Sequence, residues 1–132
     1  MSAPRRSRIR VRYAETDQMG VVYYANYLVW FEIGRTDWLR ESGWSYREME
    51  ADGFSLPVIE VRCTYRESAK YDDEIDVLTT ASLASLVRVE FAYEIVRCAD
   101  GASLATGTTV HATLDGNARP RRLPDRIRGL FA

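Results

Sequence analysis

One short stretch of the chain combines an acidic side chain with the expected start of a long helix. Asp17 lies in a polar loop that turns at Gly20, and a mostly apolar segment begins at Tyr24. A helix start exposes backbone N–H groups and the positive end of the helix dipole. A carboxylate beside such donors can attack a carbonyl carbon or activate water, while the N–H groups stabilise the oxyanion. The spacing predicts a hydrolytic site, although an aspartate before a glycine is also ordinary turn chemistry.

Three other side chains with acid–base capacity are weaker candidates. Glu32 would lie about two turns into the helix, either as an alternative carboxylate or, as we favour, in an ion pair with Arg35. Glu60 is a similar but weaker candidate on a strand. His111 is the only histidine, and without metal ligands or a nucleophile at suitable spacing we expect a hydrogen-bonded strand residue. The sequence therefore predicts no metal site and no cofactor.

Length and composition indicate one folded domain over residues 1–132. Apolar residues make up 46% of the chain, charged residues 28%, and the net charge is −1. This balance excludes a disordered chain and gives no overall attraction to nucleic acid or anionic membrane. No apolar run reaches the roughly 18–20 residues of a membrane span, and the basic N-terminus lacks the apolar segment of a signal peptide. Cys63 and Cys98, without a CxxC motif, predict two buried free thiols in the cytoplasm.

The apolar pattern predicts one long helix over residues 24–41. Its apolar residues are too many for one stripe, so we expect burial on most of its circumference, with a sheet wrapped around it. Gly34 inside this helix predicts that the helix backbone approaches another element closely at this position. Ser45 and Glu48 form a capping-box pattern, which predicts a short second helix to about Ala51. A last short helix is expected after Pro124.

Strand patterns account for most of the remaining chain. Alternating or β-rich segments predict five strands, at residues 8–13, 56–65, 74–83, 88–95 and 102–114. Short turns such as Asp100-Gly101 join the later strands, which favours antiparallel pairing. The fold class is therefore α+β, an antiparallel five-stranded sheet wrapped around one long helix. Because one sheet on one helix leaves its other face poorly covered, we expect at least a dimer.

The loop before the long helix carries a recognisable motif. It reads Tyr13-x-x-Thr16-Asp17-x-x-Gly20-Val21-Val22-Tyr23-x-x-x-Tyr27. With these residues the chain resembles the 4-hydroxybenzoyl-CoA thioesterase family of hot-dog-fold proteins and the related Tol-Pal-associated acyl-CoA thioesterases. The resemblance covers nearly the whole chain, and its later supporting segments include residues 71–75 and 109–111.

The resemblance implies an enzyme that hydrolyses an acyl-CoA to the free acid and CoA without a cofactor. It implies a hot-dog fold, homodimers that assemble into homotetramers, and active sites at the subunit interface. The family's catalytic carboxylate corresponds to Asp17, as nucleophile or general base. The helix-start residue whose N–H polarises the carbonyl corresponds to Tyr24. The Tol-Pal-associated enzymes usually carry histidine there, whereas the hydroxybenzoyl-CoA branch carries tyrosine, and the backbone N–H is the same in both.

The substrate is expected to be an acyl-CoA with a short-chain aliphatic or aromatic acyl group. Apolar and loop residues near the motif and at one strand start are candidates for substrate binding: Gly20, Val21, Val22, Pro57, Val58 and Ile59, with Met19 and Leu28 as further lining residues. Arginine binds phosphate through two hydrogen bonds, so Arg88 is a candidate for the CoA phosphates. Other candidates for this role are Arg66, Lys70, Arg121 and Arg122.

Three other functions compete with hydrolysis. A non-catalytic module that binds acyl-CoA or acyl-carrier protein is the main alternative, because Tyr24 replaces the histidine of one branch. A hot-dog dehydratase would need a catalytic histidine paired with an acid, and His111 lies far along the chain on a late strand. Nucleic-acid binding through the basic termini is disfavoured because aromatic and basic residues do not interleave there.

Overall fold

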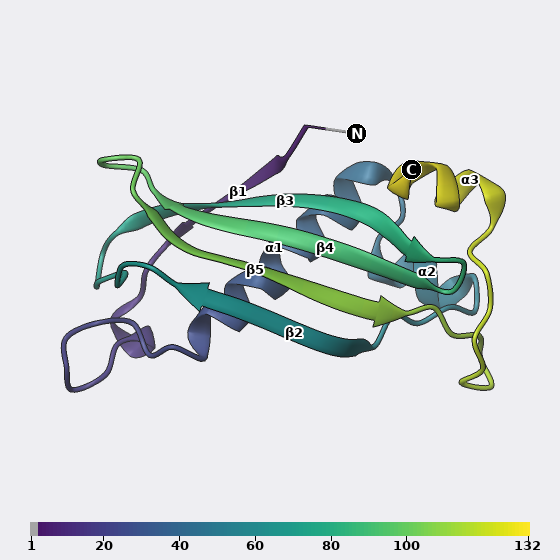
Figure 1. The fold of residues 1–132 in the computed structure, drawn as a ribbon, viewed down its shortest axis with the longest axis horizontal. Helices are drawn as coiled ribbons and strands as arrows, with labels where there is room; N and C mark the ends of the chain where they lie inside the picture. The colour runs from purple at the N-terminus through teal and green to yellow at the C-terminus, as the bar shows by residue number, and fades with distance from the viewer. Residues whose placement is uncertain (1–2) are drawn as a thin grey trace.

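One long helix, α1 (Asn26–Ser42), lies across one face of a curved five-stranded antiparallel sheet (Figure 1). The structure is a computed structural model that describes residues 3–132. The strand order is β1-β3-β4-β5-β2, so β1 and β2 form the two edges. The strands are β1 (Arg5–Arg10), β2 (Val58–Tyr65), β3 (Glu74–Ser85), β4 (Arg88–Arg97) and β5 (Ser103–Ala112). This arrangement confirms the predicted α+β hot-dog architecture.

The core lies between the sheet and the facing side of α1. Phe31 of the helix stacks on Tyr93 of β4, with ring centroids 4.3 Å apart. Gly34 confirms the predicted close approach: a Cβ atom there would lie 2.5 Å from Thr79 Oγ1 and 2.9 Å from Val77 Cγ1. Because real Cβ contacts are longer than this, any larger residue would push α1 away from β3.

The opposite side of α1 is not covered by residues 3–132. Leu28, Val29 and Ile33 are 38%, 45% and 37% exposed, so the prediction of burial on most of the helix circumference is wrong for a single chain. The sheet contacts only one side of the helix, and the apolar residues on the outer side have no neighbouring layer in this chain. Leu28 and Val29 line a hollow together with Val58 and Val61 of the exposed edge strand β2.

Two element boundaries differ from the predictions around the Asp17 loop. β1 ends at Arg10, where it pairs with Glu74, and a short 3₁₀ turn (Tyr13–Glu15) replaces the predicted end of the strand. The alternating pattern continues to Tyr13, but backbone hydrogen bonding to the segment before β3 ends at Val11, which bonds to Asp72 and Asp73. The helix begins at Asn26 rather than Tyr24, because residues 23–25 form a turn tied to the loop.

Short helices close the end of the molecule remote from the Asp17 loop. Helix α2 (Tyr46–Ala51) has the predicted capping box, in which Ser45 Oγ accepts the Glu48 N–H at 3.2 Å. The expected last helix is α3 (Asp125–Arg128), followed by a 3₁₀ turn (Gly129–Phe131) that packs Phe131 against the core. Among residues 3–132, no helix is both long enough and apolar enough to span a membrane.

Both cysteines are free thiols, as predicted, but they are half-buried rather than buried. Cys63 lies on the edge strand β2, and Cys98 follows β4 next to Asp76. Partial burial raises the pKa of each thiol above its ordinary value. Neither thiol therefore has the lowered pKa of a reactive cysteine.

Candidate active site

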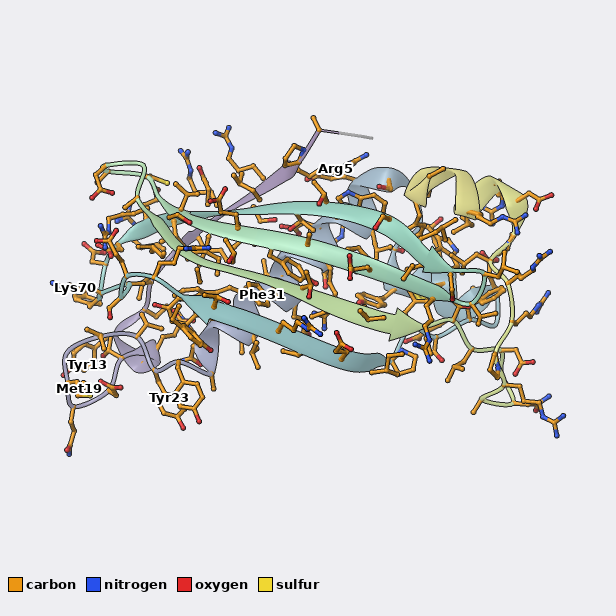
Figure 2. All side chains as sticks on the ribbon, in the orientation of Figure 1. Arg5, Tyr13, Met19, Tyr23, Phe31 and Lys70 are labelled. Atoms are coloured by element: carbon orange, nitrogen blue, oxygen red, sulfur yellow. The ribbon has the colours of Figure 1, made fainter. Side chains whose placement is uncertain are left out.

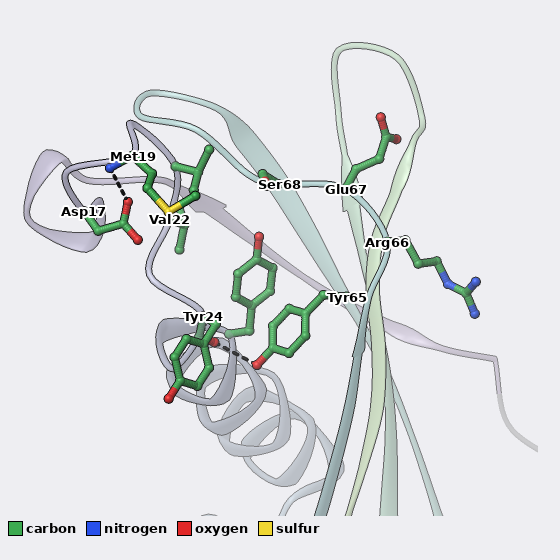
Figure 3. A pocket seen from close by; sticks show the side chains of 10 residues that line it. Asp17, Met19, Val22, Tyr24, Tyr65, Arg66, Glu67 and Ser68 are labelled. Carbon is green, nitrogen blue, oxygen red and sulfur yellow. Dashed lines mark hydrogen bonds between the residues drawn. The ribbon is translucent and has the colours of Figure 1, made fainter.

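A cavity of about 290 Å³ opens between the Asp17 loop, the start of α1 and the end of β2 (Figure 3). It joins the loop to a strand that ends some forty residues later in the chain. Its lining is mixed, with one aspartate, several tyrosines and small apolar side chains. The lining residues are Asp17, Met19, Val21, Val22, Tyr24, Tyr27, Tyr65, Arg66, Glu67 and Ser68.

Asp17 serves both as a turn residue and as a wall of this cavity. Its backbone N–H donates to Val21 O at 2.9 Å, and its carbonyl accepts the Gly20 N–H at 3.0 Å. Gly20 has φ +78°, a conformation that favours glycine. The carboxylate Oδ1 accepts the Met19 N–H at 2.9 Å, whereas Oδ2 has no hydrogen-bond partner within residues 3–132. The turn therefore fixes the carboxylate and leaves one oxygen available for chemistry.

Two backbone N–H groups just before α1 are also available. The Tyr23 N–H donates to Glu15 O, and the Asn26 N–H donates to Tyr23 O, both at 2.9 Å. Between them, the N–H groups of Tyr24 and Ala25 have no acceptor in the described part of the chain. They precede the first turn of α1, where the helix dipole is positive. Such donors are suited to stabilising a developing oxyanion.

Two tyrosines hold the far wall of the cavity in place. The Tyr65 hydroxyl donates to the Tyr24 carbonyl at 2.9 Å, which ties the end of β2 to the turn before α1. The Tyr27 hydroxyl accepts the Ala69 N–H, and the Val22 N–H donates to Ala69 O, each at 2.9 Å. Burial raises the pKa of both tyrosines, so both hydroxyls stay protonated near neutral pH. These two tyrosines are therefore neutral parts of the cavity wall.

The structure brings together the predicted residues that are close in sequence. Val21 and Val22 line the cavity with Asp17 and Tyr24, and Gly20 forms the adjacent turn. Figure 2 shows Met19 and Tyr23 at this same end of the molecule, with Lys70 nearby and Arg5 toward the other end. The motif therefore forms one contiguous site around the start of α1.

The remaining predicted residues lie elsewhere within a single chain. Pro57, Val58 and Ile59 are at the beginning of β2, whereas the cavity is at the end of that strand. Val58 instead lines a second hollow of about 290 Å³ between α1 and β2. Arg88 begins β4 and pairs with Ala112, which places it at the same remote end of the sheet.

Among residues 3–132, none of the other basic and acidic candidates pairs with the Asp17 carboxylate, although Arg66 is one of the residues around the same cavity. The Arg66 side chain points away from the cavity (Figure 3), and the Arg121 guanidinium lies over the Phe54 ring, 4.9 Å from its centroid. The expected Glu32–Arg35 ion pair is not formed among the described residues. The Arg35 Nε instead donates to the Tyr46 hydroxyl at 3.3 Å, because α2 brings that hydroxyl alongside the helix.

His111 is a satisfied core residue, as expected. Its ring is 1% exposed, and Nδ1 lies 2.8 Å from Leu56 O, which can only accept, so Nδ1 carries the proton. Nε2 then accepts from Thr109 Oγ1 at 2.8 Å, and Thr109 in turn accepts the Tyr93 hydroxyl at 2.6 Å. Burial lowers the pKa of His111 to about 4, so the ring is neutral. It lies outside the cavity and takes no part in the site.

One functional candidate escaped the sequence reasoning. Glu15 is 5% exposed and contacts both the loop and α1. Its only signal in the sequence was a charged residue at an unassigned position of the motif, two residues before Asp17. Burial of that charge became evident only in the structure.

The model of the thioesterase-like superfamily matches residues 11–131 of the chain. The chain belongs to this superfamily. A candidate acyl-CoA thioesterase of Bacillus subtilis (strain 168) is 38% identical over 81% of this chain and 77% of its own length. The acyl-CoA thioester hydrolase of Escherichia coli O157:H7 is 29% identical over 90% and 89%.

Solved structures of this superfamily share the fold. The DHNA-CoA thioesterase of Staphylococcus aureus has a TM-score of 0.84 and 36% identity, covering 91% of this chain and 80% of that chain. Together with the curated relatives, this structure confirms the expected class, a thioester hydrolase with a hot-dog fold. The site just described lies within the matched residues.

Proposed function

We propose that this thioesterase hydrolyses the thioester bond of an acyl-CoA, and that Asp17 carries the reaction. The observation that supports this role is a cavity lined by both Asp17, whose Oδ2 is free, and Tyr24, whose N–H is free like that of the following Ala25. The carboxylate supplies the attacking electrons or takes a proton from water. The two N–H groups bind the oxygen on which negative charge develops.

The reaction can follow either of two routes from the same oxygen. As a nucleophile, Asp17 bonds to the acyl carbon, the C–S bond breaks, CoA leaves as a thiolate, and water cleaves the resulting anhydride. As a general base, Asp17 takes a proton from a water molecule whose oxygen attacks the acyl carbon, and the departing thiolate recovers that proton. CoA thiolate is a good leaving group, so neither route requires a strong general acid.

The proposed acyl group is short-chain aliphatic or aromatic. The cavity, at about 290 Å³, is close to the lower limit of roughly 300 Å³ for small-molecule sites. Its tyrosine and valine walls suit a compact apolar group. Tyr24 in place of histidine resembles the hydroxybenzoyl-CoA branch, which supports including aromatic acyl groups.

We also propose that the protein forms a homodimer through β2. Three apolar side chains on this strand are more than 40% exposed, at Val58, Ile59 and Val61, and β2 has no neighbour on its outer side among residues 3–132. The other edge is protected by charge, as in the Arg8–Asp76 ion pair at 3.0 Å. Exposed apolar edges that lack such protection are typical of interfaces.

Antiparallel pairing of two β2 strands would also complete the site. A two-fold axis near the middle of β2 places the beginning of one strand opposite the end of the other. Pro57, Val58 and Ile59 of a second copy would then approach the cavity beside Tyr65. This arrangement gives the predicted substrate-binding residues a role that one chain does not provide. From the resemblance, we further propose that dimers assemble into a homotetramer and that Arg88 contacts the CoA phosphates. The two free thiols support a cytoplasmic location.

The direct test is a thiol-release assay over acetyl-, hexanoyl-, palmitoyl- and benzoyl-CoA, with Asp17→Asn as the impaired control. We expect release of free CoA from the shorter or aromatic substrates and little from palmitoyl-CoA. Tight acyl-CoA binding without thiol release would contradict hydrolysis and favour a binding module.

A further inference from the structure

The carboxylate of Glu15 is buried, yet no arginine or lysine encloses it. Its side chain is 6% exposed, and the nearest cation, Arg12 Nε, lies 3.7 Å away on a side chain that is 73% exposed. Its two oxygens instead accept two directed N–H bonds. Oε1 accepts the Arg12 backbone N–H at 2.8 Å, and Oε2 accepts the Trp30 indole N–H at 3.0 Å. A buried charge is costly unless it is hydrogen-bonded in this way.

The backbone carbonyl of the same residue makes two further contacts. It accepts the Tyr23 N–H and the Asn26 side-chain amide, both at 2.9 Å. Glu15 thus joins the start of the loop, the end of the loop and the second turn of α1. Its two side-chain and two carbonyl contacts enclose the segment that carries Asp17 at one end and the free Tyr24 N–H at the other.

We infer that Glu15 is a positioning residue, which sets the placement of the Asp17 carboxylate relative to the Tyr24 and Ala25 N–H groups. This inference rests on the proposed function of Asp17. Bond-forming geometry is sensitive to displacements of about 1 Å, which can lower a rate about a hundredfold. A loop released from Trp30 would still fold and bind substrate, but its carboxylate and donors would no longer be held together.

The isosteric change Glu15→Gln tests this role without creating a cavity. An amide has one acceptor oxygen, so its NH₂ group must face either the Arg12 N–H or the Trp30 indole N–H, donor against donor. Trp30→Phe removes the indole donor and relieves that conflict. The two changes should therefore be non-additive, because they break the same contact.

We would measure kcat and KM with benzoyl-CoA for Glu15→Gln, Trp30→Phe and the double variant. Glu41→Gln is the matched control, because that glutamate lies on α1, the helix that carries Trp30, with a 52% exposed side chain paired to Arg5. We expect Glu15→Gln to lower kcat at least twentyfold with KM within threefold of wild type. Adding Trp30→Phe to Glu15→Gln should lower kcat little further. Hydrogen exchange at the Tyr23 amide should accelerate at least tenfold, while the thermal midpoint stays above the assay temperature.

Several results would overturn the inference. The first is a kcat of Glu15→Gln within twofold of wild type. The others are an equal loss of kcat in Glu41→Gln, or a loss of kcat in Glu15→Gln that matches its unfolded fraction at the assay temperature. The exchange measurement separates this inference from the proposed function. If wild type released no thiol from any acyl-CoA, the proposed function would fail, and unchanged exchange at Tyr23 in Glu15→Gln would independently refute the positioning role.

Discussion

Two polar clusters in this molecule differ in how completely their groups are paired. Toward one end of the sheet, His111, Thr109 and Tyr93 form a buried chain in which every ring nitrogen and hydroxyl has a partner. At the other end, Asp17 keeps one free oxygen beside two free N–H groups. The first cluster lies in the core, and the second lines an open cavity.

The difference separates polar groups that hold the fold from groups that are free for the proposed chemistry. A buried group without a partner costs about 1–3 kcal/mol, so the His111 chain is stable only because its pairing is complete. Unpaired groups persist at low cost around the Asp17 cavity because water reaches them. An incompletely paired carboxylate near unpaired donors is therefore the better guide to function than the only histidine.

The largest effect expected on folding stability is acid destabilisation at the His111 end. Burial lowers the pKa of folded His111 from 6.5 to about 4, so the unfolded chain takes up a proton first as pH falls. The stabilisation is complete above pH 6.5 and is lost progressively toward pH 4, by roughly 3 kcal/mol in total. Urea unfolding at pH 7, 5.5 and 4.5 measures this slope.

The variant His111→Gln is the control for that titration, since it keeps a polar side chain but has no group that titrates in this window. We expect its unfolding free energy to vary much less between pH 6.5 and 4. Identical slopes for wild type and His111→Gln would show that the histidine does not behave as a buried neutral group.

An effect of intermediate size on activity is expected at the proposed β2 interface, where a second copy would complete the Asp17 cavity. Val61→Lys places a charge on the helix-facing side of β2, at the middle of the proposed interface. We expect a monomer in sedimentation velocity and a kcat/KM at least tenfold lower, equivalent to about 1.4 kcal/mol. Thr64→Lys, on the other face of the same strand, should remain at least dimeric. A fully active Val61→Lys monomer would show that one chain contains the whole site.

The smallest effect should come from the cavity wall. Tyr65→Phe removes the hydroxyl that donates to the Tyr24 carbonyl and so loosens the turn that carries the free N–H. One such hydrogen bond contributes about 0.5–1.5 kcal/mol, so we expect kcat to fall by roughly two- to tenfold. A thousandfold loss would instead indicate that the Tyr65 hydroxyl takes part in the chemistry.

Sequence patterns predicted the fold well because most elements carry local signals. Alternation identified the strands, the capping box at Ser45 located α2, and Gly34 indicated the close approach to β3. The end of β1 was missed because Tyr13 continues the alternation, while backbone hydrogen bonding to the segment before β3 ends at Val11. The exposed side of α1 was missed because the side-chain type of an apolar residue does not reveal whether it faces the core or the surface of the chain.

The site was predictable to the extent that it is local. Asp17, Val21, Val22 and Tyr24 fall within eight residues, and a single turn brings them together. Tyr65 was not predicted, because its position depends on the direction of β2 relative to α1, which places the end of that strand at the cavity. Glu15 was missed for a related reason, since the indole that holds it lies fifteen residues further along.

The most direct test of the account is to measure kcat and the unfolding free energy side by side for Asp17→Asn and Thr109→Val. Asparagine retains an oxygen for the Met19 N–H, so the turn survives while the nucleophile or base is lost. We predict that Asp17→Asn lowers kcat at least about a thousandfold, or ~4 kcal/mol, with nearly unchanged stability. Thr109→Val should cost about 2–3 kcal/mol of stability and little activity. Wild-type turnover in Asp17→Asn would contradict the account.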